Sequence, residues 1–213
     1  MSPRVAKVLV EATDELARRD PVLADAIART GLPDLRRGRR RTDHFAELAR
    51  AIVYQQLAGR AAAAIHGRFV ALFPGPEPTP EGVLALTDEQ LRSAGLSRAK
   101  AASIRDLAEK VVAGAVELDH VARLTDDEIV GELTLVRGIG RWTAEMFLIF
   151  QLRRLDVWPV DDLGVRNGYA RLYGLAVPPK PRELEPLGEV FRPFRSVAAW
   201  YCWRATDVVL PTA

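Results

Sequence analysis

The chain has 213 residues, 48% of them hydrophobic, so it can bury a sizeable core as one domain or as two small lobes. Its 30 Lys and Arg residues against 28 Asp and Glu give a formal net charge of +2, so a nucleic-acid partner would require positive charge gathered on one face. The single cysteine, Cys202, excludes an internal disulfide and a four-cysteine zinc or iron–sulfur site. The sequence shows neither an apolar run of the ~18 residues that a membrane span needs nor a signal-peptide core, which favours a cytoplasmic protein.

Helical periodicity dominates the chain from the first residues to the last. Helices are expected, in chain order, over 5–30 with a break near Pro21, from a cap at Thr42 or Asp43 through Tyr54, and over 61–73, 97–114, 141–152, 162–173, 181–190 and 194–208. The arginine-rich stretch 32–41 predicts a solvated loop, and prolines interrupt the chain over 74–80.

Two capping boxes mark further helix starts. Thr87 with Gln90 opens a short helix that Gly95 ends, and Thr125 with Glu128 opens another. No segment alternates with a period of two for long enough to predict a strand, so the fold class is all-α.

The first segment with specific chemistry is Leu-Val-Arg-Gly-Ile-Gly-Arg-Trp-Thr-Ala over 135–144, between two predicted helices. Gly138 and Gly140 permit a tight turn and let a phosphate approach the backbone, while Ile139 can hold the turn in the core. Such a hairpin grips a DNA phosphate without reading bases. The plain alternative is an ordinary helix–turn–helix corner. A dinucleotide-binding fingerprint is excluded because no strand precedes the glycines and the third glycine is missing.

A pair of acidic residues, Asp161 and Asp162, follows Pro159 at the expected start of a helix. Aspartate at such a position commonly caps the helix. Only one of the two can be the N-cap, however, and this raises the chance that the pair has a function.

These motifs, in this order, resemble the helix-hairpin-helix, Gly/Pro-loop, aspartate superfamily of DNA glycosylases, and most closely its 3-methyladenine DNA glycosylase II branch. Three other stretches are similar to the family: residues 51–58, the Gly-x-x-x-x-Lys-Ala step at 95–101, and the Pro-aromatic-Arg-Ser element within 191–196, followed by Trp200 and Trp203. The resemblance covers about residues 40–208. It implies two helical lobes within a single domain over 1–213, with the hairpin at 133–144 and the active site in the cleft between the lobes.

The chain also departs from some family members. Only ~40 residues precede the match, so it resembles a compact form without the N-terminal β-rich domain of the longer bacterial members. The iron–sulfur branch is excluded by the single cysteine. Trp142 holds the position where the bifunctional glycosylase/lyases carry a lysine, which implies a monofunctional enzyme with water as the nucleophile.

The resemblance implies a role for individual residues. Asp162 is the expected catalytic carboxylate, because it lies twenty residues past Trp142 and the following helix stabilises its negative charge; Asp161 is expected to brace the Pro159 loop. Gln56, with Leu57 in reserve, is expected to fill the gap left by a flipped base. Aromatic walls suit cationic bases, and the expected substrate-binding residues are Trp142, Tyr54, Met146, Trp158, Phe194 and Trp200. The expected DNA-binding residues are Gln56, Leu57, Arg137, Gly138, Ile139, Gly140, Arg141 and Thr143.

The resemblance requires no cofactor, although family members often bind a monovalent cation at the hairpin, here at the carbonyl groups of Thr134, Val136 and Ile139. The implied function is excision of alkylated purines from double-stranded DNA by a monomer in base-excision repair. Three alternatives stay open: a glycosylase of the same fold for another lesion, a non-catalytic DNA-binding protein, and an all-α adaptor in which the motifs are packing corners.

Overall fold

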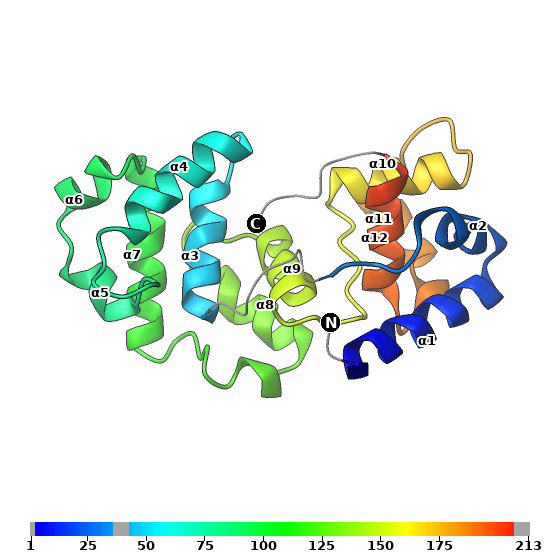
Figure 1. Ribbon diagram of the computed structural model, residues 1–213, viewed down its shortest axis with the longest axis horizontal. Coiled ribbons are helices and arrows are strands. Elements are labelled where there is room, and N and C mark those ends of the chain that lie inside the picture. The colour runs from blue at the N-terminus through cyan, green and yellow to red at the C-terminus, as the bar shows by residue number, and fades with distance from the viewer. Residues whose placement is uncertain (1–2, 36–42, 207–213) are drawn as a thin grey trace. The chain divides into compact units, whose positions relative to one another are not determined.

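A computed structural model describes residues 3–35 and 43–206, with the side chains of 3–5 left out of the description. These residues form helices and connecting segments, with no strand among them, so the all-α prediction is confirmed (Figure 1). None of the helices in the described ranges is both long and apolar enough to cross a membrane. The described residues divide into two compact units, 3–35 with 153–206 and 43–152.

The first unit is assembled from both ends of the chain. Helices α1 (Pro3–Arg19) and α2 (Pro21–Thr30) pack with α12 (Arg195–Ala205), which also packs against α10 (Leu163–Leu172) (Figure 1). The helix α11 (Pro181–Leu187) and the short 3₁₀ helix η3 (Glu189–Phe191) complete the unit. Every residue of α12 over 196–203 is buried, as expected for a helix surrounded by others.

Close packing of α10 on α12 depends on a glycine. A Cβ atom built at Gly168 would lie 1.8 Å from the carbonyl oxygen of Cys202, so the two backbones are in direct contact there. The approach leaves no room for any side chain at residue 168. This contact fixes the distance between α10 and α12. It therefore also fixes the position of Asp162, the residue at the start of α10.

The second unit holds the remaining helices around α7 (Arg98–Val112), which packs against α3 (His44–Tyr54), α5 (Pro80–Ala85) and α6 (Asp88–Ser93). Helix α4 (Gly59–Val70) packs against α3. After a 3₁₀ turn, η1 (Val121–Arg123), the chain forms α8 (Asp126–Thr134), α9 (Arg141–Met146) and a π-helical segment, η2 (Phe147–Gln151). The hairpin of the sequence motif is the turn between α8 and α9.

Most helix starts agree with the sequence. Asp20 caps α2, Asp43 caps α3, and both capping boxes form, at Thr87 and Thr125. The helix expected over 141–152 instead changes to a π turn after Met146, and α11 ends at Leu187, before the 190 expected. Helix α5 was not expected, because its first residue, Pro80, was assigned to the interruption. The expected loop over 36–41, a cap at Thr42 and the end of the last helix at 207–208 lie outside the described residues.

Candidate functional site

Asp162 lies in the first unit as the N-cap of α10 and is 5% exposed. Its Oδ1 atom accepts a hydrogen bond from the backbone N–H of Val165 at 2.8 Å and another from Nε1 of Trp203 on α12, also at 2.8 Å. A buried carboxylate requires such donors, and the positive end of the helix dipole favours its charge further. The first donor comes from the helix that Asp162 begins, and the second from the helix on which α10 packs.

Gly164 makes room for this arrangement. A Cβ atom at this position would lie 2.8 Å from Cδ1 of Trp203 and 3.0 Å from Oδ1 of Asp162. The hydrogen bond between the two side chains therefore requires a glycine here. Trp203 is fully buried and was not among the expected site residues, although the C-terminal element of the resemblance includes it.

Asp161 takes a different place from its neighbour. Its side chain is exposed, and the Pro159 loop is closed by the backbone N–H of Asp162, which donates to the carbonyl oxygen of Pro159 at 3.0 Å. The hydrogen bond that closes the loop thus belongs to Asp162, and the bracing role of Asp161 stays a prediction. Burial raises the pKa of the nearby Cys202 thiol, and the negative charge of Asp162 raises it further.

The hairpin of the second unit combines an exposed turn with an anchored interior. Ile139 is 4% exposed, whereas Gly138, Gly140, Arg137 and Arg141 are exposed. Gly138 has a φ of +78°, which favours glycine, and Ile139 N–H donates to the carbonyl oxygen of Val136 at 3.1 Å.

Two side chains near the hairpin are less available to a ligand than the sequence suggested. Nε of Arg141 lies 2.9 Å from Oε1 of the buried Glu145, so this arginine forms an ion pair within α9. Thr143 is buried, with 7% of its surface exposed. The exposed groups best placed to contact a ligand are thus the backbone of the two glycines and the side chain of Arg137.

The turn between α3 and α4 carries the residue expected to fill a DNA gap. Gln56 and Leu57 are exposed, and Gln56 has a φ of +56°, in the left-handed region that side-chain-bearing residues rarely adopt. The preceding residue, Gln55, donates from Nε2 to the carbonyl oxygen of Gly138 at 2.9 Å. A hydrogen bond therefore joins the expected gap-filling turn directly to the hairpin.

The expected substrate-binding residues fall into both units. In the first, Trp158 is buried, donates from Nε1 to the carbonyl oxygen of Leu184 at 3.0 Å and contacts Phe191, which makes it part of the core. Trp200 is 6% exposed, and among the described residues its Nε1 atom has no hydrogen-bond partner. Phe194, at the N-cap of α12, is partly exposed.

In the second unit, the guanidinium of Arg50 lies 4.0 Å from the ring centroid of Tyr54, and Trp142 is partly exposed beside the hairpin. Met146 is buried next to a cavity of about 10 Å³, which is too small for a purine.

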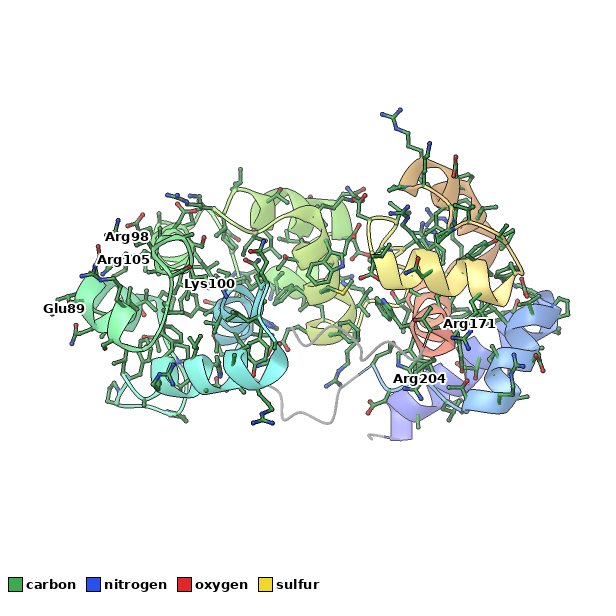
Figure 2. The ribbon with its side chains drawn as sticks, turned by 90° about the horizontal axis from the view of Figure 1, so that it is seen from above. Glu89, Arg98, Lys100, Arg105, Arg171 and Arg204 are labelled. Carbon is green, nitrogen blue, oxygen red and sulfur yellow. The ribbon has the colours of Figure 1, made fainter. Side chains whose placement is uncertain are left out.

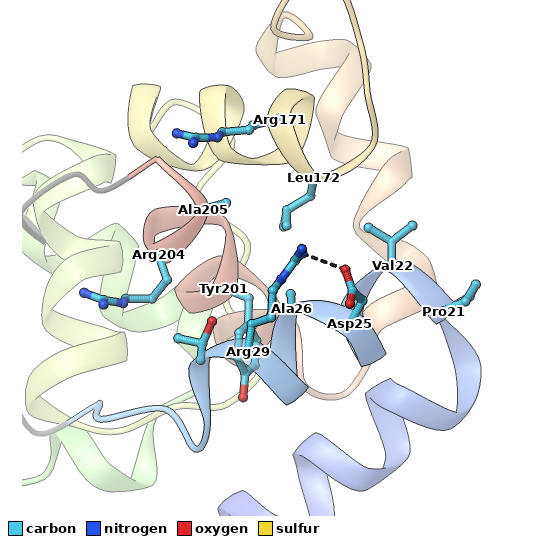
Figure 3. Close-up of a pocket in the computed structure, with 11 residues that line it drawn as sticks. Pro21, Val22, Asp25, Ala26, Arg29, Arg171, Leu172, Tyr201, Arg204 and Ala205 are labelled. Carbon is cyan, nitrogen blue, oxygen red and sulfur yellow. Dashed lines mark ion pairs between the residues drawn. The ribbon is translucent and has the colours of Figure 1, made fainter.

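A groove of about 570 Å³ on the first unit lies between α2, α10 and α12 (Figure 3). Arg29, Arg171 and Arg204 line it, together with Asp25, which pairs with Arg29 at 2.7 Å. None of the expected site residues lines this groove. Its charged walls also differ from the aromatic walls expected around an alkylated base.

The sequence of the chain matches the model of the HhH-GPD superfamily base excision DNA repair proteins over residues 49–193. The chain therefore belongs to this superfamily, and its class is that of the base-excision repair glycosylases. It is 40% identical over 174 residues to DNA-3-methyladenine glycosylase 1 of Schizosaccharomyces pombe, covering 81% of this chain and 76% of the relative.

Solved structures give the same result. The S. pombe 3-methyladenine DNA glycosylase Mag1, solved in complex with abasic DNA, superposes with a TM-score of 0.82 at 35% identity, over 93% of this chain and 98% of that one. A DNA-3-methyladenine glycosidase from Bacillus halodurans also gives 0.82 at 35% identity, over 91% and 88% of the two chains. The resemblance inferred from the sequence is thereby confirmed at the level of family and fold.

Proposed function

We propose that this protein is a monofunctional DNA glycosylase that hydrolyses the N-glycosidic bond of alkylated purines in double-stranded DNA. The observation that carries the proposal is the buried carboxylate of Asp162, held by two hydrogen bonds at the start of α10. The named relatives, which are 3-methyladenine glycosylases, support the substrate class. The alternative of an all-α adaptor gives no reason for a buried, oriented carboxylate at this place.

Asp162 stabilises positive charge on the sugar in the proposed mechanism. The bond between C1′ and the base nitrogen breaks, and its electron pair leaves with the base, so the sugar develops oxocarbenium character. An ionised carboxylate stabilises this charge, and a water oxygen then forms the new bond to C1′ while its proton passes to the carboxylate or to solvent. An alkylated purine already carries positive charge and leaves readily, so one carboxylate suffices.

The second unit supplies the grip on DNA in this proposal. The backbone N–H groups around Gly138 and Gly140, with the side chain of Arg137, hold phosphate groups irrespective of sequence. Gln56 enters the stack when the damaged nucleotide is flipped out, which offsets part of the few kcal/mol that unstacking costs.

A cation at the hairpin would take the main-chain oxygens of Thr134, Val136 and Ile139. Main-chain carbonyl oxygens suit hard cations, and the oxygen of Val136, which accepts the N–H of Ile139 at 3.1 Å, keeps a second lone pair for an ion. The described residues contain no cluster of three or more His, Cys, Asp or Glu side chains suited to a metal. A bound ion would serve to attract a phosphate.

The test is a panel of duplexes that carry 3-methyladenine, 7-methylguanine, 1-methyladenine or ethenoadenine, with 8-oxoguanine and undamaged DNA as comparisons. The wild-type protein should release alkylated bases, and Asp162→Asn should slow single-turnover release by about 100-fold or more while DNA binding survives. Asp161→Asn, the matched control one residue away, should change release only a few-fold.

Each contrary outcome identifies another function. Release of 8-oxoguanine alone would place the protein with glycosylases for other lesions. Binding without release of any base would make it a non-catalytic DNA-binding protein. If Asp161→Asn abolished release and Asp162→Asn did not, the catalytic carboxylate would be the other member of the pair.

A further inference from the structure

Helix α7 contacts both turns of the second unit that the proposed function assigns to DNA. One is the α3–α4 turn over 55–58, which carries Gln56, and the other is the hairpin turn over 137–140. The α3–α4 turn is held through Lys100 and the hairpin through Ser103 and Asp106. These three residues follow one another at intervals of three, so they lie on one face of α7, spaced by about 4.5 Å along its axis.

Lys100 binds the end of α3. Its Nζ atom donates to the carbonyl oxygens of Val53 at 2.7 Å and of Gln55 at 2.8 Å. The last carbonyl groups of a helix lack partners within the helix, and a cation is favourable at this end of the helix dipole. Figure 2 shows Lys100 beside α3, whereas Arg98 and Arg105 extend from the other side of α7.

Ser103 and Asp106 bind the hairpin. Oδ2 of Asp106 accepts the backbone N–H of Arg137 at 2.7 Å, and its Oδ1 atom pairs with Nζ of Lys110 at 2.5 Å. A Cβ atom at Gly138 would lie 2.6 Å from Oγ of the buried Ser103, so the hairpin backbone rests directly on α7. The bond from Gln55 Nε2 to the carbonyl oxygen of Gly138 then joins the two turns to each other.

The α3–α4 turn needs such support because of its backbone. A left-handed conformation is strained for a non-glycine residue such as Gln56, and it persists only where the surroundings enforce it. Lys100 holds the carbonyl group of Gln55 immediately before the strained residue, and the side chain of Gln55 is held by the hairpin. The residue before Gln56 is thus fixed at two points.

We propose that Lys100 and Gln55 are positioning residues, which hold the Gln56 turn at a set distance from the hairpin. Gln56 can then fill the gap in the DNA stack while the hairpin binds a phosphate of the same duplex. This inference rests on the proposed function. It assigns Lys100 a role that requires no contact with DNA, because both of its hydrogen bonds go to main-chain oxygens within the protein.

The experiment is a double-mutant cycle between Lys100→Met and Gln56→Ala. Single-turnover release of 7-methylguanine is measured from duplexes in which the lesion lies opposite cytosine or, mispaired, opposite thymine. Each single variant should slow release from the paired lesion by about tenfold and from the mispaired lesion by less, because opening a mispair costs less. The double variant should be no slower than Gln56→Ala alone, since Lys100 acts through that residue.

Two further variants separate positioning from general stability. Gln55→Ala removes the link to the hairpin without leaving a buried charge, and it should reproduce the preference for mispaired lesions. Arg98→Met removes a cation from the other side of α7 and should leave the ratio of paired to mispaired release unchanged. Hydrogen exchange should rise over 55–58 in both Lys100→Met and Gln55→Ala, while α5 and α7 stay protected.

The inference is overturned if the losses of the double variant multiply to about 100-fold, or if paired and mispaired lesions are affected equally. It is also overturned if Gln56→Ala leaves release from the paired lesion unchanged. A wild-type protein that releases no alkylated base refutes the proposed function instead. Exchange that rises throughout the second unit would show Lys100 to be a general stabiliser.

Discussion

At the scale of single residues, the carboxylate of Asp162 depends on two donors of different origin. The N–H of Val165 is local and forms wherever an aspartate caps a helix. The indole of Trp203 lies 41 residues along the chain and reaches Asp162 only because α10 packs on α12. The orientation of the proposed catalytic group is therefore set by tertiary packing as well as by the cap.

Replacing Trp203 with phenylalanine tests this dependence. Trp203→Phe keeps an aromatic ring but removes the donor to Oδ1, so the carboxylate gains freedom and single-turnover excision should fall by about tenfold. Tyr201→Phe is the matched control, because it removes a partly buried hydrogen bond from the same helix, the one to the carbonyl oxygen of Gly31. Equal effects of the two changes on excision would show that Trp203 contributes stability alone.

At this scale, the sequence predicts interactions between residues that are close in the chain, and it does not predict those between distant residues. An aspartate cap at the start of α10 is a local feature of the sequence, which left Asp161 and Asp162 as candidates, and the structure shows Asp162 to be the cap. The bond to Trp203 joins distant residues, and nothing in the spacing of the two residues predicts it. The left-handed backbone of Gln56 could not be predicted either, because glutamine, unlike glycine or asparagine, does not indicate that conformation.

At the scale of elements, the two glycines of the hairpin have different physical roles. Gly138 combines a positive φ with direct contact to Ser103, so a side chain there would disrupt the turn itself. A Cβ atom at Gly140 would meet nothing within 4 Å, so this position tolerates a methyl group in the free protein. Only Gly140 can therefore separate the binding of phosphate from the integrity of the fold.

Gly140→Ala should weaken binding to damaged and undamaged duplexes alike, since the methyl group would occupy space that a phosphate needs. Loss of one phosphate contact should reduce the slope of log K against log[salt] by about 0.9. The comparison is Gly131→Ala, the same change at an exposed position of α8, where alanine should leave binding intact. Unchanged affinity and slope in Gly140→Ala would exclude the clamp at this residue.

Helix starts were more predictable than helix interiors and ends. The boxes at Thr87 and Thr125 form as expected, because the four residues of each box contain both hydrogen-bonding partners. The π turn over 147–151 follows a normal apolar pattern, and no local residue marks it. Such a turn is determined by the tertiary packing around it, and this packing cannot be predicted from a single sequence.

At the scale of the whole molecule, the basic charge of the chain is carried almost entirely by arginine. Lysines occur only at positions 7, 100, 110 and 180. Lys100 and Lys110 are bound to groups within the second unit, and Lys7 pairs with Glu11 one turn further along α1, at 3.9 Å. By the family resemblance, Trp142 occupies the position where the bifunctional glycosylase/lyases carry a lysine. Lys180 is exposed at the N-cap of α11, so few lysine amines are available for covalent chemistry on DNA.

Borohydride trapping checks the monofunctional assignment. A lyase forms a Schiff base between an amine and the opened sugar, and reduction makes this bond permanent. The wild-type protein should therefore release base from a lesion-bearing duplex without a trapped protein–DNA adduct, whereas a bifunctional 8-oxoguanine glycosylase/lyase tested in parallel should give one. A trapped band of comparable intensity would assign the protein to the lyase branch.

The close approach of α10 to α12 also determines the fate of the single thiol. Cys202 lies on the buried face where its own carbonyl oxygen meets Gly168, and burial raises the pKa of its thiol. Only a thiolate reacts readily with electrophiles, so this cysteine stays protonated and inaccessible in the folded protein. An agent that alkylates DNA bases would also alkylate an exposed thiolate. The burial of Cys202 therefore protects the only cysteine of the chain from this reaction in the folded protein.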